Sequence, residues 1–231
     1  NPDFWRVAAF VTAVLFVSQQ WRFMDLLMPK FVMRYFGEDV PFANLASINL
    51  WGCVFLPPLV ASQTAHLDDI TLIIPGLWIM AIAPTFLVLH TSVPSTAAWI
   101  AMITVGEVIW SPRSSSYAAS MAPDGQEGMF LMLSSWPTYL TKYPAGIFSG
   151  WLLGKYLPAC PDCSDKLGHY EEPYQTCLEC PGWHGDATSL WMFVLGLSLV
   201  SPVIVTLIAP CLRPNTTNTG TPVPYNIAKV R

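Results

Sequence analysis

The stretch AAWIAMITVGEVIWSPRSSSYAASM, residues 97–121, decides the class of this protein. It is long enough to cross a bilayer as a helix, because about 20 apolar residues span a hydrocarbon core about 30 Å thick. Glu107 lies near its middle. A carboxylate at that depth is costly unless it faces water or a partner, so Glu107 is a candidate for binding a proton or a solute. The stretch predicts a functional membrane helix, and transport is the first expectation.

The composition of the whole chain agrees with a membrane protein. Of its 231 residues, 11% are charged and 53% are apolar, and the mean hydropathy is +0.44. Soluble domains carry about 25% charged residues. The net charge of −4 says little about partners, because much of the acid lies in residues 158–188, and no basic tract indicates a nucleic-acid partner. We therefore expect an integral, multi-pass protein of a plasma or organellar membrane, with the lipid bilayer as its first partner.

Six apolar runs are long enough to be membrane helices, which predicts an all-α membrane protein with a six-helix bundle over residues 1–213. An even number of crossings places both termini on one side, and the Lys and Arg near the span ends slightly favour the cytoplasm. Residues 158–188 then form a cysteine-rich extracytoplasmic loop and residues 214–231 a polar cytoplasmic tail. The runs are residues 4–36, 43–66, 70–90, 97–121, 128–157 and 190–212.

Prolines are frequent inside these runs. Each removes a backbone donor and tends to kink its helix, which a membrane tolerates only where neighbours or water satisfy the freed carbonyls. Such a density of prolines fits helices that bend during a transport cycle, although prolines are common in membrane helices in general. They are Pro29, Pro57, Pro58, Pro75, Pro84, Pro112, Pro137, Pro144 and Pro202.

The partner of Glu107 must come from another helix, because its own run has no lysine and Arg113, six residues on, is not on the same face. Lys142 is the expected cation for Glu107 or Asp25, unless it extends to the membrane interface. Tyr139 either lines a pore with it or belongs to an aromatic belt. Asn49 either binds solute or, as we favour, hydrogen-bonds between helices.

Arg22 and Asp25 are three residues apart and so share one helical face, where they can pair. Such a pair is less costly in a membrane than an isolated charge, and the two side chains could face the interior of the bundle. The alternative is that this segment lies at the interface, with Trp21 as an anchor. A second pattern, Gly146-x-x-x-Gly150-x-x-x-Gly154, is typical of close helix packing.

Four cysteines in the loop, Cys160, Cys163, Cys177 and Cys180, have the spacing C-x2-C-x13-C-x2-C. That spacing suits a structural zinc site, but two disulfides are the alternative on an oxidising face, and the expected topology favours disulfides. Cys53 and Cys211 lie in membrane runs and are expected to be small core residues. We expect no cofactor. The chain has no nucleophile elbow, no H-E-x-x-H and no phosphate loop, so we do not expect an enzyme.

Several motifs resemble the major facilitator superfamily of transporters. Arg22-x-x-Asp25-x-x-x-Pro29, Phe36-Gly37-Glu38 and Ser47-Ile48-Asn49 resemble the seventh and eighth helices of its protist members. The segment from Gly106-Glu107 through Ser111-Pro112 to Ala122-Pro123 is similar to their tenth helix and, more loosely, to that of proton-coupled oligopeptide transporters.

The resemblance implies that this chain, which begins Asn-Pro-Asp-Phe without an initiator methionine, is the carboxy-terminal six-helix half of a twelve-helix carrier. It also implies that Asp25 serves proton coupling and that Glu107 holds the amino end of a peptide. Arg22 beside Asp25 and the cysteine-rich loop depart from the oligopeptide pattern.

The first hypothesis is therefore a secondary active transporter, a proton-coupled symporter of a small polar solute such as a peptide or amino acid derivative. Its partners would be protons, the solute, and either an amino-terminal six-helix half or a dimer mate. The alternative is a non-transporting scaffold or accessory subunit of a larger membrane complex, because six helices alone cannot form an alternating-access path between two halves.

Overall fold

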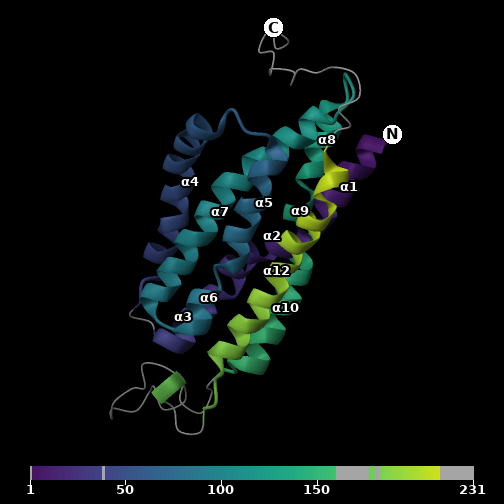
Figure 1. Cartoon of the computed structure of the whole chain (residues 1–231). Helices are drawn as coiled ribbons and strands as arrows, with labels where there is room; N and C mark the ends of the chain where they lie inside the picture. Colours follow the sequence, from purple (N-terminus) through teal and green to yellow (C-terminus); the bar gives the residue numbers. More distant parts are fainter. Residues whose placement is uncertain (1, 38–39, 160–176, 180–182, 214–231) are drawn as a thin grey trace.

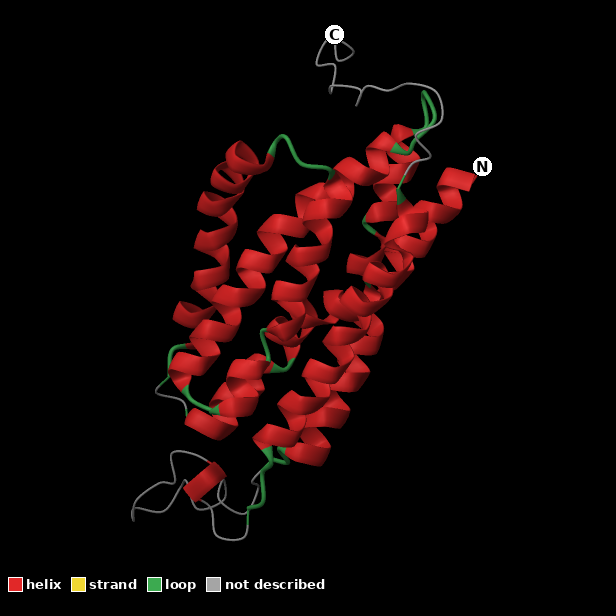
Figure 2. Ribbon diagram, viewed as in Figure 1, coloured by secondary structure: helices red, strands yellow, loops and turns green. Residues whose placement is uncertain are grey.

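The computed structural model of the chain describes residues 2–37, 40–159, 177–179 and 183–213, and within these ranges all regular structure is helical (Figures 1 and 2). The expected tail at residues 214–231 and the cysteines at positions 160, 163 and 180 lie outside the described residues. The all-α class expected from the sequence is confirmed for the described part of the chain.

The apolar runs form helices that are often divided into shorter pieces. A short 3₁₀ helix, η2 (Cys177–Glu179), lies between the last two helices. In chain order the helices are α1 (Pro2–Ala13), α2 (Leu15–Leu26), α3 (Met28–Phe36), α4 (Phe42–Thr64), α5 (Asp69–Ile82), α6 (Thr85–Leu89), α7 (Val93–Ser120), α8 (Glu127–Ser134), α9 (Trp136–Leu140), α10 (Lys142–Tyr156) and α12 (Ala187–Leu212).

Four segments of the described chain are long and apolar enough to cross a membrane. They are α4 with 23 residues, the α5–α6 unit Asp69–Leu89 with 21, α7 with 28 and α12 with 26. A fifth is possible if α1 and α2, which are bent by 42° relative to each other, count as one span. Residues 128–157, expected as a single span, are divided among α8, α9 and α10. The sixth crossing stays a prediction.

The first helix begins and the last helix ends on the same side of the bundle (Figure 1). There the Tyr117 hydroxyl group, near the end of α7, donates a hydrogen bond of 2.9 Å to the Leu212 carbonyl oxygen at the end of α12. The beginning of α1 lies beside them in Figure 1. An arrangement with both ends on one side is what an even number of crossings requires.

The division between α1 and α2 falls at Val14, where the sequence has no proline. The first backbone N–H groups of α2 have no partner within their own helix. The Val17 N–H group instead donates to the Ser201 hydroxyl oxygen on α12, at 2.9 Å. A side chain from another helix therefore replaces the missing backbone acceptor, which makes the bend tolerable within a membrane.

The division between α5 and α6 has a proline as its cause. Pro84 has no N–H group to donate to the Met80 carbonyl oxygen. The buried Gln20 side chain of α2 donates to that oxygen at 2.6 Å, and its own oxygen accepts from the Trp99 indole at 3.3 Å. In contrast, α4 continues through Pro57 and Pro58, and α7 through Pro112. These prolines therefore weaken their helices without ending them.

The centre of the bundle is the contact between α5 and α7. A Cβ atom at Gly106 would lie 2.7 Å from the Met80 backbone nitrogen and 2.8 Å from the Gly76 carbonyl oxygen. At Gly76 it would lie 2.8 Å from Trp110 Cβ. The two backbones can approach this closely only because both positions are glycine. This contact fixes how far α7 is shifted along α5 and how it is rotated about its own axis, and therefore where Glu107 lies.

Candidate functional site

The Glu107 carboxylate lies between three helices and is partly buried. Its Oε2 atom accepts a hydrogen bond of 3.0 Å from the Trp21 indole nitrogen on α2 and one of 3.1 Å from Asn49 Nδ2 on α4. The partner of Glu107 does come from other helices, as expected, but it consists of two neutral donors. Within the described residues no cation forms an ion pair with Glu107.

Asn49 joins the carboxylate to a second acceptor on α7. Its Nδ2 group also donates to the Thr104 hydroxyl oxygen at 3.0 Å, which an amide can do because it carries two hydrogens. The Thr104 hydroxyl group in turn donates to the Ile100 carbonyl oxygen at 2.7 Å. Asn49 therefore hydrogen-bonds between helices, the role favoured from the sequence.

Trp21 is held in place by a second indole. Its ring stacks on that of Trp110, with centroids 5.7 Å apart and planes inclined by 13°. Trp110 is buried and its indole nitrogen contacts the Met80 sulfur at 3.4 Å. Because Trp110 is also packed against Gly76, the Trp21 donor rests on the most closely packed part of the bundle.

Cys53 is a further member of this site that sequence reasoning did not identify. It is half-buried, and its thiol interacts with the Glu107 carboxyl group. It lies one helical turn after Asn49 on α4, so the two side chains share a face. The expected role of Cys53 and Cys211 as core residues is wrong for Cys211, which is exposed. We refer to Trp21, Asn49, Cys53 and Glu107 as the Glu107 site.

Arg22 and Asp25 form the expected pair, with 3.5 Å between Arg22 Nη1 and Asp25 Oδ2. Asp25 is 55% exposed, so this pair is weakly held. Arg22 also donates to the Thr138 carbonyl oxygen of α9 at 3.1 Å, while its buried Nε atom has no hydrogen-bond partner. The pair therefore lies next to the Glu107 site on α2 but faces α9.

The structure does not bring Lys142 to either acid. Its ammonium group is exposed and lies 5.1 Å from the centre of the Tyr139 ring. At this distance the ammonium group is attracted to the face of the tyrosine ring. Tyr139 is 66% exposed. The expected pairing of Lys142 with Glu107 or Asp25 is thus absent among the described contacts.

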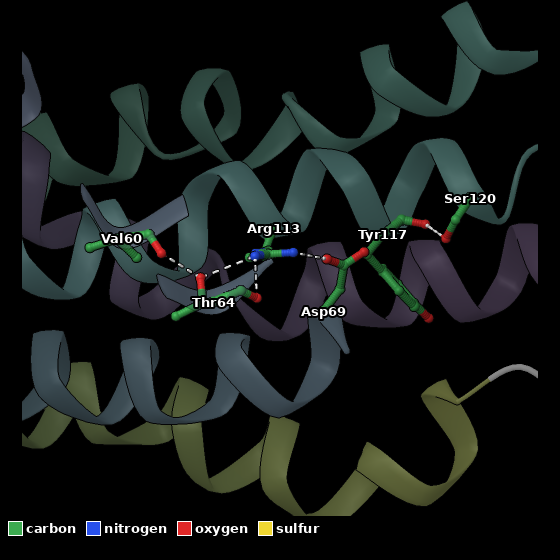
Figure 3. A network of polar contacts seen from close by, with 6 residues as sticks. All are labelled: Val60, Thr64, Asp69, Arg113, Tyr117 and Ser120. Carbon is green, nitrogen blue, oxygen red and sulfur yellow. Dashed lines mark hydrogen bonds and ion pairs between the residues drawn. The ribbon is translucent and has the colours of Figure 1, made fainter. Parts of the chain in front are cut away.

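A second polar network surrounds Arg113, six residues after Glu107 on α7 (Figure 3). Arg113 donates to the Thr64 carbonyl oxygen at 2.8 Å and to its hydroxyl oxygen at 3.1 Å, and it pairs with Asp69 at 3.3 Å. Thr64 is the last residue of α4 and Asp69 the first of α5. Arg113 therefore joins the turn between α4 and α5 to α7, and its positive charge is favourably placed at the end of α4.

The loop between α10 and α12 is closed at its base. The Asp186 N–H group donates to the Tyr156 carbonyl oxygen at 2.7 Å, and the Trp183 indole donates to the Pro158 carbonyl oxygen at 2.9 Å. Cys177 is disulfide-bonded. Its three sequence neighbours in the motif lie outside the described residues, so the pairing stays a prediction. Among the residues with described positions, no three His, Cys, Asp or Glu side chains gather as a metal site.

Comparison with known proteins adds no relative. No protein-family model, no curated protein and no solved structure matches the chain.

Proposed function

We propose that this protein is a proton-coupled secondary active transporter of a small polar solute, such as a peptide or amino acid derivative. In this proposal the chain is the carboxy-terminal six-helix half of a major facilitator superfamily carrier. Four helices long and apolar enough to cross a membrane support a multi-pass protein. The motifs around Arg22, Asn49 and Glu107 support the choice of superfamily.

The observation that carries the proposal is the state of Glu107. An acid at the centre of a membrane helix costs about 2.5–3.5 kcal/mol and is seldom retained without a role. The Trp21 and Asn49 donors stabilise the ionised form, since hydrogen bonds to charged groups are worth about 1.5–3 kcal/mol. No described cation neutralises it. A partly exposed carboxylate of this kind can take up a proton or an ammonium group.

The second carboxylate oxygen is the place for that contact. Trp21 and Asn49 both donate to Oε2, so neither of these hydrogen bonds occupies Oε1, and the Cys53 thiol is a third group that interacts with the carboxyl group. A carboxylate has about four lone-pair positions, which leaves acceptor capacity for a solute N–H or for a proton. Binding of either species changes the charge of the site, and such a change can bias an equilibrium between two conformations.

Arg22 and Asp25 add a second charged position on α2, the helix that carries Trp21. Their loose pairing at 3.5 Å allows either charge to exchange its partner for a solute group. Asp25 would then contribute to proton coupling and Arg22 would contact an anionic group of the solute. An amino-terminal half, or a second copy of the chain, would complete the path between two halves.

The outer face of α10 favours a second candidate, a scaffold subunit of a membrane complex. Cβ atoms built at Gly146, Gly150 and Gly154 meet nothing within 4 Å. Such small residues allow another membrane helix to approach closely. If this candidate holds, disrupting the stripe with Gly150→Leu dissociates a complex, and no solute is moved by the purified protein.

Reconstitution into liposomes tests the transporter, with the chain present as its dimer or together with its amino-terminal half. Uptake of labelled dialanine and of labelled alanine is measured with and without an imposed pH gradient, for the wild type, Glu107→Gln and Glu127→Gln. Glu127 is an exposed acid in the first turn of α8 and serves as the control. We expect the gradient to drive uptake in the wild type and the control but not in Glu107→Gln. Undiminished gradient-driven uptake by Glu107→Gln would contradict the assigned role.

A further inference from the structure

Helix α4 is held to the bundle by very little apolar packing. It packs against α7, and Leu45 is the one buried residue that α4 contributes. Phe42 and Ile48 pack partly against the core, but other large side chains are exposed, with fractions of 64% for Leu50, 60% for Phe55 and 61% for Leu59. In lipid, burying such side chains against another helix brings no hydrophobic free energy, because lipid tails are equally apolar. The polar contacts of α4 therefore decide how it sits on α7.

Two polar contacts of different kinds hold α4. Near its beginning, Asn49 donates to Thr104 and to the Glu107 carboxylate. At its end, Thr64 accepts from Arg113, which is itself paired with Asp69 (Figure 3). An arginine keeps its charge at every physiological pH, so the second contact is permanent. The first contact is charge-assisted only while Glu107 is ionised.

The helix is weakened between these two contacts. Pro57 and Pro58 cannot donate to the carbonyl oxygens of Cys53 and Val54, so two consecutive backbone hydrogen bonds are missing. Consecutive missing bonds lower the cost of bending at this point. Residues 42–54, which carry Asn49, can thus move relative to residues 59–64, which carry the Arg113 contact.

We propose that Asn49 is a positioning residue that couples the charge of Glu107 to the bend of α4. While Glu107 is ionised, Asn49 holds residues 42–54 against α7. When a proton or an ammonium group neutralises Glu107, this half is released and α4 bends at Pro57–Pro58 about the Thr64–Arg113 contact. The inference rests on the proposed function only in naming the species that neutralises Glu107.

Few other ionisable groups act on this contact. On α4 the ionisable group that interacts with Glu107 is Cys53, and α6 carries no ionisable side chain. On α2, Arg22 and Asp25 pair with each other. The ionisable groups at the ends of α5 and α8 are Asp68, which precedes α5, Asp69, paired with Arg113, and Glu127, an acceptor for the Gly125 N–H group.

Hydrogen exchange of backbone amides, measured by mass spectrometry in lipid nanodiscs, tests the coupling. The variants are Glu107→Gln, which removes the charge at constant size, Asn49→Leu, which removes the donor, and the double variant. We expect residues 42–54 to exchange on the order of tenfold faster in each single variant, because a charge-assisted hydrogen bond is weakened or lost. The double variant should match the single ones, and residues 59–64 should be unchanged.

Two further variants make the result specific. Thr206→Val removes the hydrogen bond between Trp78 on α5 and Thr206 on α12, two helices other than α4 and α7. It should leave the exchange rates of α4 unchanged. Adding Pro57→Ala and Pro58→Ala to Glu107→Gln should reduce the difference between the two halves of α4. Equal exchange along all of α4, no change in either single variant, or additive effects in the double variant would overturn the coupling.

Hydrogen exchange of α4 and gradient-driven uptake test the coupling and the proposed function separately. If α4 is released in Glu107→Gln while gradient-driven uptake persists, the coupling holds and the transport role of Glu107 fails. If uptake is lost while α4 exchanges as in the wild type, the coupling alone is overturned.

Discussion

Replacing Gly106 by alanine should separate α5 from α7 and destabilise the protein. The added Cβ atom would lie 2.7 Å from the Met80 backbone nitrogen, 2.7 Å from Met80 Cβ and 2.8 Å from the Gly76 carbonyl oxygen. Backbone atoms cannot rotate out of the way, so one helix must shift. Overpacking of this kind costs about 1–3 kcal/mol.

The magnitude follows from comparison with a glycine in open space. Alanine is favoured over glycine inside a helix by roughly 0.5–1 kcal/mol, and this gain applies at both positions. At Gly150, where a Cβ atom meets nothing within 4 Å, only the gain remains. For Gly106→Ala the steric cost exceeds it, so we expect a net loss of about 1–2 kcal/mol. Because the gain is common to both, the two variants should differ by the steric cost alone, about 1–3 kcal/mol.

The assay is unfolding of the purified protein in one detergent, followed by helical circular dichroism across a titration with sodium dodecyl sulfate. Gly106→Ala should unfold at a lower dodecyl sulfate fraction than the wild type, and Gly150→Ala at an equal or higher one. If Gly106→Ala proves as stable as Gly150→Ala, the close contact between α5 and α7 does not exist as described, and the placement of Glu107 would have to be revised.

Two further predictions concern single hydrogen bonds. Trp21→Phe keeps a ring to stack on Trp110 but removes the donor to Glu107. A double-mutant cycle of unfolding free energies with Glu107→Gln should therefore give a coupling energy of about 1.5 kcal/mol between the two positions. Additive effects of the two substitutions would refute that contact. At the start of α12, hydrogen bonds with Ser189 lower the pKa of Asp186. The stabilisation by the Asp186 carboxylate is therefore fully present above the ordinary pKa of an aspartate, and it is lost as the pH falls through the lowered pKa. Asp186→Ala should lower the melting temperature at pH 7 but not at pH 2, and an equal loss at both would contradict the cap.

The helices could be predicted from the sequence because long apolar runs in a chain with few charges leave little alternative in a membrane. Their divisions could not. The break at Val14 depends on Ser201, which accepts from the Val17 N–H group across 184 positions of sequence. Pro57, Pro58 and Pro112 left their helices unbroken, because removing one donor weakens a helix without always ending it.

The candidate site was predicted in part. Glu107 was identifiable from the cost of an isolated charge, and the Arg22–Asp25 pair from its spacing of three residues. Cys53 and Thr104 were within reach of the same reasoning, since they lie one turn from Asn49 and Glu107. Trp21 was not, because its contact with Glu107 depends on how α2 and α7 pack across 86 positions of sequence.

The expected cation was the main error at this site. Charge complementarity alone suggested Lys142, but its ammonium group lies over Tyr139 on the neighbouring helix turn. Two neutral donors, Trp21 and Asn49, replace it at Glu107. This difference bears on function, because a carboxylate without a fixed cation remains free to take up a proton or a positively charged solute group.

Proton entry coupled to solute entry tests the central claim most directly. Liposomes containing the reconstituted protein and an internal pH dye are mixed with dialanine, without an imposed pH gradient. If Glu107 carries the proton, the interior acidifies on addition of the dipeptide with the wild type and with Glu127→Gln, but not with Glu107→Gln. Acidification by Glu107→Gln at the wild-type rate would contradict the account.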